Sequence, residues 1–207
     1  MIDKTDPLNF VQKKAFQVLI EDIVMNKIES GEMISVFALG EDFQQNDEPL
    51  LQLCNPGDGS DKSEWTANLK KLKRQYEERF FSPILTISNE LTNIEAAKRS
   101  PVMEQIQLVA INGFKKQHIT GNRKLIIVSD MLQNTPEFSM YKTQISYSEF
   151  IKQDYAQRVK PDLNNVKVEL YYIMNSPKLQ TRRHLNFWEQ YFDAAGARIT
   201  LVKTLEG

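Results

Sequence analysis

The sequence contains very few of the residues that form disulfides or bind soft metal ions. Its 207 residues include one cysteine, Cys54, and two histidines, His118 and His184. One cysteine excludes a disulfide within the chain, and the three residues lie too far apart for the ligand spacing of a zinc finger. The composition is therefore compatible with a reducing compartment, and no structural zinc site is expected.

Long apolar runs, a strong net charge and phosphate-binding loops are also missing. No run of 18 apolar residues is present, so no membrane-spanning helix is predicted. The formal net charge is -1, which does not indicate a nucleic-acid partner. Gly57 and Gly59 lie in a turn-rich loop and lack the strand-to-helix spacing of a phosphate-binding loop.

The amino end of the given sequence is short for a strand. Met1 and Ile2 precede the charged turn of residues 3–7, whereas a strand usually has about five residues. We therefore expect the first strand to begin upstream of Met1, where a targeting segment or a membrane anchor would also lie. The given residues themselves lack the basic and apolar regions of a signal peptide.

Strand and helix patterns alternate along the rest of the chain. Short apolar runs predict strands at residues 33–39, 50–54, 124–129, 166–174 and 198–203. Apolar spacing and capping residues predict helices at residues 6–28, 64–95 (with a candidate break at Ser82-Pro83), 99–114, 148–158 and 180–195. This order predicts one α/β domain over residues 1–207, Rossmann-like and doubly wound, with a mainly parallel sheet covered by helices on both faces.

One predicted strand does not follow this alternation. Residues 50–54 come too soon after the strand at residues 33–39 for a helical crossover. A short connection of this kind joins antiparallel strands. We therefore expect residues 50–54 to form an antiparallel strand at the edge of the sheet.

Oxygen-bearing side chains cluster where the predicted strands and helices end. Asp3, Thr5 and Asp6 follow the presumed first strand, Ser100 opens a predicted helix, and Asp130 ends the strand at residues 124–129. The carboxyl ends of parallel strands meet at one edge of a sheet, so these groups should lie close together. Carboxylate and hydroxyl oxygens suit Mg²⁺ or Mn²⁺ rather than zinc. The sequence therefore predicts a magnesium or manganese site at this edge.

The same residues resemble the metal-ion-dependent adhesion site of von Willebrand factor A domains. Residues 3–7, Asp-Lys-Thr-Asp-Pro, resemble the Asp-x-Ser-x-Ser turn of that family. Ser100 resembles the threonine of its second motif, and Ser129-Asp130 resembles its strand-end Thr-Asp-Gly. The resemblance implies that Asp3 and Thr5 bind the metal, that Ser100 supplies a hydroxyl, and that Asp130 contacts the ion directly or through water. The antiparallel edge strand is also a feature of that fold.

The sequence departs from the family pattern at three positions. Pro7 replaces the last serine of the first motif, Met131 replaces the usual glycine after Asp130, and Ser100 stands where threonine is commoner. Asp6 would then offset the missing serine ligand.

A structural interpretation of these residues remains open beside the metal-binding one. Asp6 before Pro7, and Ser100 before Pro101, are typical helix-capping pairs. Asp3 and Asp130 are typical turn formers at strand ends. The joint placement of all of them at one sheet edge favours a metal site over four unrelated structural roles.

The predicted site indicates binding to a partner protein rather than catalysis. A divalent cation held by few side chains leaves a coordination position for an acidic side chain of a partner, with loops at residues 40–63 and 131–147 framing the surface. One alternative is a magnesium-dependent phosphoesterase or nuclease that uses Asp3, Asp6 and Asp130. Against it, the sequence shows no evident general base, second metal cluster or basic cleft. The other alternative is a degenerate fold that binds partners without metal.

Overall fold

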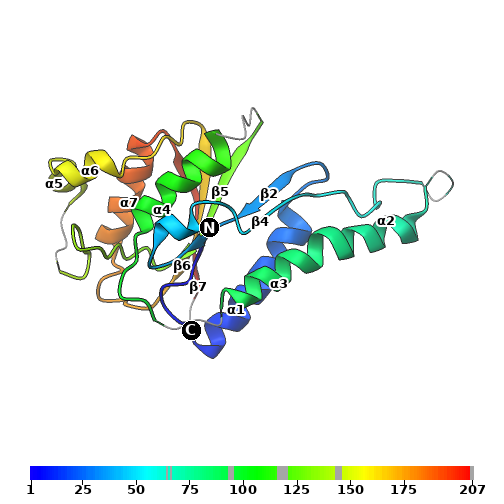
Figure 1. The fold of residues 1–207 in the computed structure, drawn as a ribbon, viewed down its shortest axis with the longest axis horizontal. Helices are drawn as coiled ribbons and strands as arrows, with labels where there is room; N and C mark the ends of the chain where they lie inside the picture. Colours follow the sequence, from blue (N-terminus) through cyan, green and yellow to red (C-terminus); the bar gives the residue numbers. More distant parts are fainter. Residues whose placement is uncertain (64, 66, 93–95, 116–120, 143–145, 206–207) are drawn as a thin grey trace.

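The main sheet is parallel throughout and has five strands in the order β3-β1-β5-β6-β7 (Figure 1). The computed structural model describes residues 1–63, 65, 67–92, 96–115, 121–142 and 146–205. The strands are β1 Ile2–Asp3, β3 Ala38–Leu39, β5 Arg123–Ser129, β6 Val166–Ile173 and β7 Arg198–Leu205. The predicted α/β class with a mainly parallel sheet is confirmed.

A separate two-stranded sheet is formed by β2 (Met33–Val36) and β4 (Leu51–Cys54). The two strands are antiparallel, as predicted, with Met33 opposite Cys54 and Val36 opposite Leu51. However, β4 does not join the edge of the main sheet. The predicted strand at residues 33–39 is divided into β2 and β3, because only Ala38 and Leu39 pair with β1 in the main sheet.

Helix α1 (Phe10–Asp22) begins later than the sequence predicted. Asn9 is its N-cap, and the side chains of Asn9 and Gln12 bond each other's backbone N–H in a capping box. The prediction that Asp6 caps this helix is therefore wrong, and its carboxylate is available for another role. A π-helical turn, Ile23–Lys27, continues α1.

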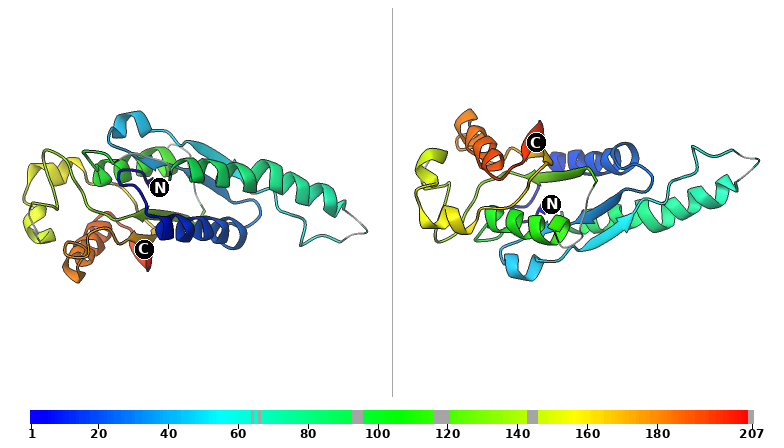
Figure 2. Two further views of the ribbon diagram at one scale, coloured as in Figure 1. Left: turned by 90° about the horizontal axis from the view of Figure 1, so that it is seen from below. Right: turned by 90° about the horizontal axis from the view of Figure 1, so that it is seen from above.

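The long helical region is not broken at Ser82-Pro83. It consists of α2 (Leu69–Tyr76), a π-helical turn (Glu77–Phe81) and α3 (Ser82–Glu90), which follow one another directly. Pro83 lies in the first turn of α3, where its missing N–H costs little. The predicted helix at residues 64–95 was too long, because the described residues 65, 67 and 68 precede α2 and residues 91–92 follow α3; residues 64, 66 and 93–95 lie outside the described residues. All views show α2 projecting away from the main sheet (Figures 1 and 2).

Both faces of the main sheet are covered. On one face, α1 and α3 bury Phe16 and Ile84 in a cluster with Val128 of β5. On the other, α4 and α7 bury Ile106 and Trp188 in a cluster with β5 and β6. The remaining helical segments are α4 Val102–Val109, a π-helical turn Ala110–Lys115, α5 Tyr147–Phe150, α6 Asp154–Arg158, α7 Arg182–Ala194 and a 3-10 turn Phe43–Asn46. The helix predicted at residues 148–158 is thus two short helices.

Strand β5 is central in the sheet, which explains its continuous apolar sequence. It pairs with β1 on one side and with β6 over its full length on the other. A strand covered on both faces is apolar at successive positions instead of alternate ones. Among the helices that the structure describes, none is both long and apolar enough to cross a bilayer.

Candidate functional site

The candidate site lies where the chain changes direction across the sheet. From β1 the chain passes to β3 on one side, and it later returns to β5 on the other side of β1. Ligands of open α/β sheets bind at the carboxyl ends of strands at such a switch point. Asp3 ends β1 and Ser129 ends β5. Since Ile2 is aligned with Val128, these two polar residues are brought side by side.

Asp3 is held by three hydrogen bonds. Ser129 Oγ donates to its Oδ2 at 2.6 Å, and the Thr5 amide and Thr5 Oγ1 donate to its Oδ1 at 2.9 and 2.7 Å. Asp3 and Thr5 are both buried. These three hydrogen bonds therefore fix the position of the Asp3 carboxylate.

Ser100 joins this group from a distant part of the chain. Its hydroxyl lies 3.1 Å from Thr5 Oγ1, within hydrogen-bond distance. A backbone bridge with Asn134 holds Ser100 in place, through bonds in both directions of 2.9 Å. Helix α4 shows no side-chain cap, so the capping interpretation of Ser100 is wrong. The structure thus brings Asp3, Thr5 and Ser100 together.

Asp130 follows Ser129 and presents a carboxylate oxygen without a partner. Its Oδ1 accepts a hydrogen bond of 2.9 Å from the Leu132 amide. Its Oδ2 is buried and has no hydrogen-bond partner within the described part of the chain. An unsatisfied buried carboxylate oxygen is costly and rare in folded proteins, so this atom indicates a missing ligand or proton.

The turn after β5 has an unusual backbone. Met131 has φ 59°, in the left-handed region that residues other than glycine rarely adopt. Its amide donates to Ser129 Oγ at 2.8 Å, and its buried carbonyl accepts a bond of 3.0 Å from Trp188 Nε1. These contacts hold the turn that positions Asp130. The glycine expected here from the family pattern would adopt this conformation without strain.

Burial raises the pKa of all three carboxylates at the site, and repulsion between carboxylates adds to the effect at Asp130 and Asp3. Burial raises the pKa of Asp130 well above its usual value, and the charges of Asp3 and Asp6 add to the effect. Burial also raises the pKa of Asp3, against the lowering effect of its bonds from Ser129 and Thr5. The pKa of Asp6 is raised by burial, while its contact with Asp130 acts in the opposite direction. The site therefore favours a bound cation or retained protons over three free negative charges.

The donor set suits a hard cation with few protein ligands. Within the described ranges, no three His, Cys, Asp or Glu residues are grouped as a metal cluster. An ion here would be held by the Asp3 and Asp130 carboxylates and by hydroxyl groups, with water in the remaining positions. Mg²⁺ tolerates such a site because it keeps several of its waters.

Cys54 and His184 lie outside this donor set. Cys54 is exposed on β4. His184 is buried on α7, where it contacts Tyr172 and the Met131 carbonyl. His118 lies outside the described residues.

Two residues near the site were not identified from the sequence. Burial and the nearby charges of the three aspartates raise the pKa of the Tyr141 phenol, whose side chain is half-exposed. Gln180 Nε2 donates to the Asp130 carbonyl at 3.1 Å. Tyr141 belongs to the predicted framing loop at residues 131–147, but no spacing signal marks it. Most of the other predicted loop, residues 40–63, leads away from the site because β4 runs antiparallel to β2.

No protein-family model matches the chain, and no curated protein matches it significantly.

Proposed function

We propose that the chain is a metal-dependent binding module that holds one Mg²⁺ or Mn²⁺ ion where β1 and β5 end. The observation that carries the proposal is the buried Oδ2 atom of Asp130, which makes no hydrogen bond to the described residues, although the Asn175 side chain lies near enough to lower the pKa of this carboxylate. A divalent cation next to it would neutralise the carboxylates that otherwise repel one another.

The arrangement of hydroxyl groups supports the resemblance to von Willebrand factor A domains. Thr5 and Ser129 come from separate segments and bond to Asp3, and Ser100, from a third segment, lies beside Thr5. The left-handed Met131 stands where that family commonly has glycine. The antiparallel edge strand of that family has no counterpart in the main sheet, because β4 pairs with β2 in a separate sheet.

A binding role follows from the small number of protein ligands. Mg²⁺ requires six oxygen ligands, and this site offers two buried carboxylates and a few hydroxyls. The open positions would accept an acidic side chain of a partner protein. Tyr141, which is half-exposed near the three aspartates, would contact the same partner.

Calorimetry with Mg²⁺ and Mn²⁺ tests the metal site. We expect one ion to bind the parent chain and an Asp130→Asn variant to lose at least tenfold in affinity. Asp61→Asn, which changes an exposed carboxylate on the loop before α2, is the matched control. If the parent gives no heat of binding, the result would support the alternative of a degenerate fold that binds partners without metal.

Partner binding is tested by comparing proteins retained from an extract with and without a chelator. A partner of the proposed kind is lost with the chelator and with Asp130→Asn, and is retained by Asp61→Asn. Magnesium-dependent hydrolysis of a phosphodiester by the parent would instead support the phosphoesterase alternative.

A further inference from the structure

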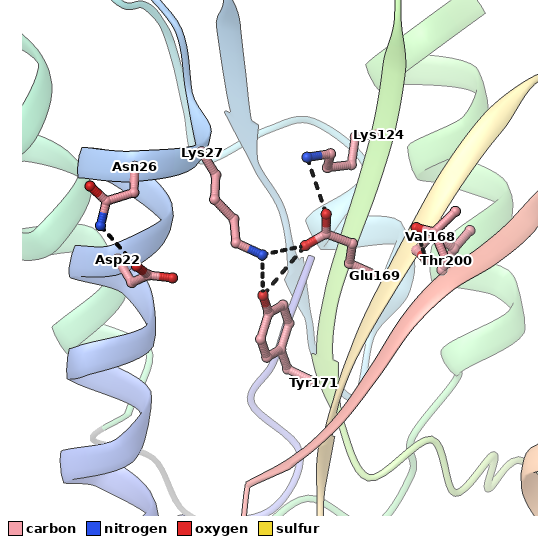
Figure 3. A network of polar contacts seen from close by, with 8 residues as sticks. All are labelled: Asp22, Asn26, Lys27, Lys124, Val168, Glu169, Tyr171 and Thr200. Atoms are coloured by element: carbon pink, nitrogen blue, oxygen red, sulfur yellow. Dashed lines mark hydrogen bonds and ion pairs between the residues drawn. The ribbon is translucent and has the colours of Figure 1, made fainter.

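A second cluster of charged side chains lies on the sheet, and its charges are already paired with one another. Lys27 Nζ lies 2.8 Å from Glu169 Oε2, and Lys124 Nζ lies 3.1 Å from Glu169 Oε1 (Figure 3). Tyr171 accepts a bond of 2.6 Å from Lys27. This cluster therefore needs no ligand to balance its charges. The candidate site differs, since Asp130 Oδ2 makes no hydrogen bond to the described residues.

Asn175 lies beside the candidate site, just beyond the end of the next strand of the sheet. β6 is parallel to β5, with Ser129 opposite Tyr172, and it ends at Ile173. Asn175 therefore leaves the sheet at the same edge as Asp130, one strand away. Its side chain lies near enough to the Asp130 carboxylate to lower the pKa of that group. Asn175 is exposed and Asp130 is buried, so Asn175 lies on the solvent side of this carboxylate.

A buried residue of α1 fixes the orientation of the Asn175 amide. Gln12 Oε1 accepts a bond of 3.0 Å from the Asn9 amide, which can only donate, so Gln12 has only its NH2 group left for Asn175. Gln12 Nε2 donates to Asn175 Oδ1 at 3.2 Å. The NH2 group of Asn175 is therefore the end that faces Asp130. An ionised carboxylate accepts only, which requires the same orientation.

The Asn175 amide has a hydrogen-bond donor to spare. Its NH2 group carries two N–H bonds that diverge, so one can point at Asp130 while the other is open to solvent. A partner's carboxylate that uses one oxygen at the ion has a second oxygen, which needs a donor once water is excluded. Asn175 is placed on the side from which such a carboxylate would approach.

We propose that Asn175 is a recognition residue of the candidate site, whose amide N–H donates to the carboxylate of the partner's acidic side chain. This inference rests on the proposed function, because the ion has to bring the carboxylate to the site. Gln12 is a positioning residue, since it orients Asn175 from below the surface. The pair would favour a group that offers an acceptor oxygen over one that only donates.

Water proton relaxation of the Mn²⁺-loaded protein, titrated with sodium acetate, tests the proposal. Acetate that displaces a water molecule from the bound ion lowers the relaxation enhancement, which gives its dissociation constant. We expect Asn175→Ala to weaken acetate about fivefold, the loss of one hydrogen bond, while Mn²⁺ still binds. Asn186→Ala, at an exposed position on α7, is the control and should change neither. In the Mg²⁺-loaded parent, acetate should also shift the side-chain amide resonances of Asn175.

A double-mutant cycle separates orientation of Asn175 from stability of the fold. Gln12→Ala removes the donor that orients Asn175 and should also weaken acetate. The double variant should lose no more than Asn175→Ala alone, because Gln12 acts through Asn175. Asn9→Ala removes the other half of the capping box and keeps the bond from Gln12 to Asn175. It should therefore lower stability and leave acetate affinity unchanged.

The outcomes distinguish this inference from the proposed function. A parent chain that binds no Mn²⁺ would contradict the metal site, and the inference would fail with it. Mn²⁺ binding with equal acetate affinity in the parent and Asn175→Ala, or with no effect of acetate on the parent, would overturn the role of Asn175 alone. Additive losses in the double variant would show that Gln12 acts through the fold and would overturn its positioning role.

Discussion

Ser129 and Asp3 are 126 positions apart in the sequence, and the Ser129 hydroxyl donates a 2.6 Å hydrogen bond to the Asp3 carboxylate. This bond joins the ends of β5 and β1 at the switch point of the sheet. It also links the two carboxylates of the candidate site, because Asp130 follows Ser129 directly.

Replacing Ser129 with alanine should weaken both the fold and the metal site. The variant removes the bond to Asp3 and leaves the Met131 amide without its acceptor. We expect the free energy of unfolding to fall by about 2–3 kcal/mol, measured by urea denaturation, and the Mg²⁺ affinity to fall with it. Ser148→Ala, at an exposed position on α5, is the control and should change neither. A fully stable Ser129→Ala protein would contradict the structural role of this bond.

Substitution of Asn9 should destabilise the fold, whereas substitution of Asp6 should not. Asn9→Ala removes the N-cap of α1 and should lower the free energy of unfolding by about 1 kcal/mol. Asp6→Asn removes a carboxylate whose pKa is raised by burial, so without divalent cations it should not destabilise the fold. Urea denaturation in the presence of a chelator measures both. A loss for Asp6→Asn as large as that for Asn9→Ala would contradict the expectation that burial makes the charged Asp6 carboxylate unfavourable.

Glutamate 169 should be a major electrostatic contributor to stability. Burial would raise its pKa, but hydrogen bonds from Lys27 and Lys124 outweigh this effect and lower it. Its stabilising contribution is present above the pKa of the unfolded side chain and is lost as the pH falls through the lower folded pKa. We expect Glu169→Gln to cost about 1–3 kcal/mol at pH 7 and much less near pH 3.

Denaturation of the parent and Glu169→Gln proteins at both pH values measures that difference. Glu189→Gln is the matched control, since its ion pair with Arg182 is exposed on the arginine side and weak at 3.3 Å. An equal cost for Glu169→Gln at pH 7 and pH 3 would show that packing, not charge, explains the effect.

Histidine 184 should make the fold less stable in mild acid. Burial lowers its pKa from 6.5 to about 4, against the raising effect of the Met131 carbonyl. Between these values the unfolded chain binds a proton that the folded chain does not, so stability falls as the pH drops from 6.5 to 4. The loss is about 3 kcal/mol in total, with no contribution from this residue above pH 6.5.

The contribution of His184 is separated from those of the carboxylates by comparison with His184→Asn. The parent should lose stability more steeply than the variant between pH 6.5 and 4, as measured by denaturation at each pH. Parallel pH profiles would contradict a buried neutral imidazole.

Local pattern was sufficient for most elements of the fold. The apolar run of β5 predicted a central strand, and the short connection before β4 predicted antiparallel pairing. Both follow from the number and kind of adjacent residues. The start of α1 was missed because Asp6-Pro7 and Asn9 are both acceptable caps, and only the capping box with Gln12 decides between them.

The sequence by itself determined which elements form and which strand ends carry oxygen-bearing side chains. Only the tertiary structure decided which of these side chains meet, because hydrogen bonds such as those of Asp3 with Ser129, and of Thr5 with Ser100, join residues that no local spacing relates. It also decided that the Asp130 carboxylate has a buried oxygen without a hydrogen-bond partner in the described chain. Burial and long-range pairing depend on packing between distant segments, and a linear pattern does not contain that information.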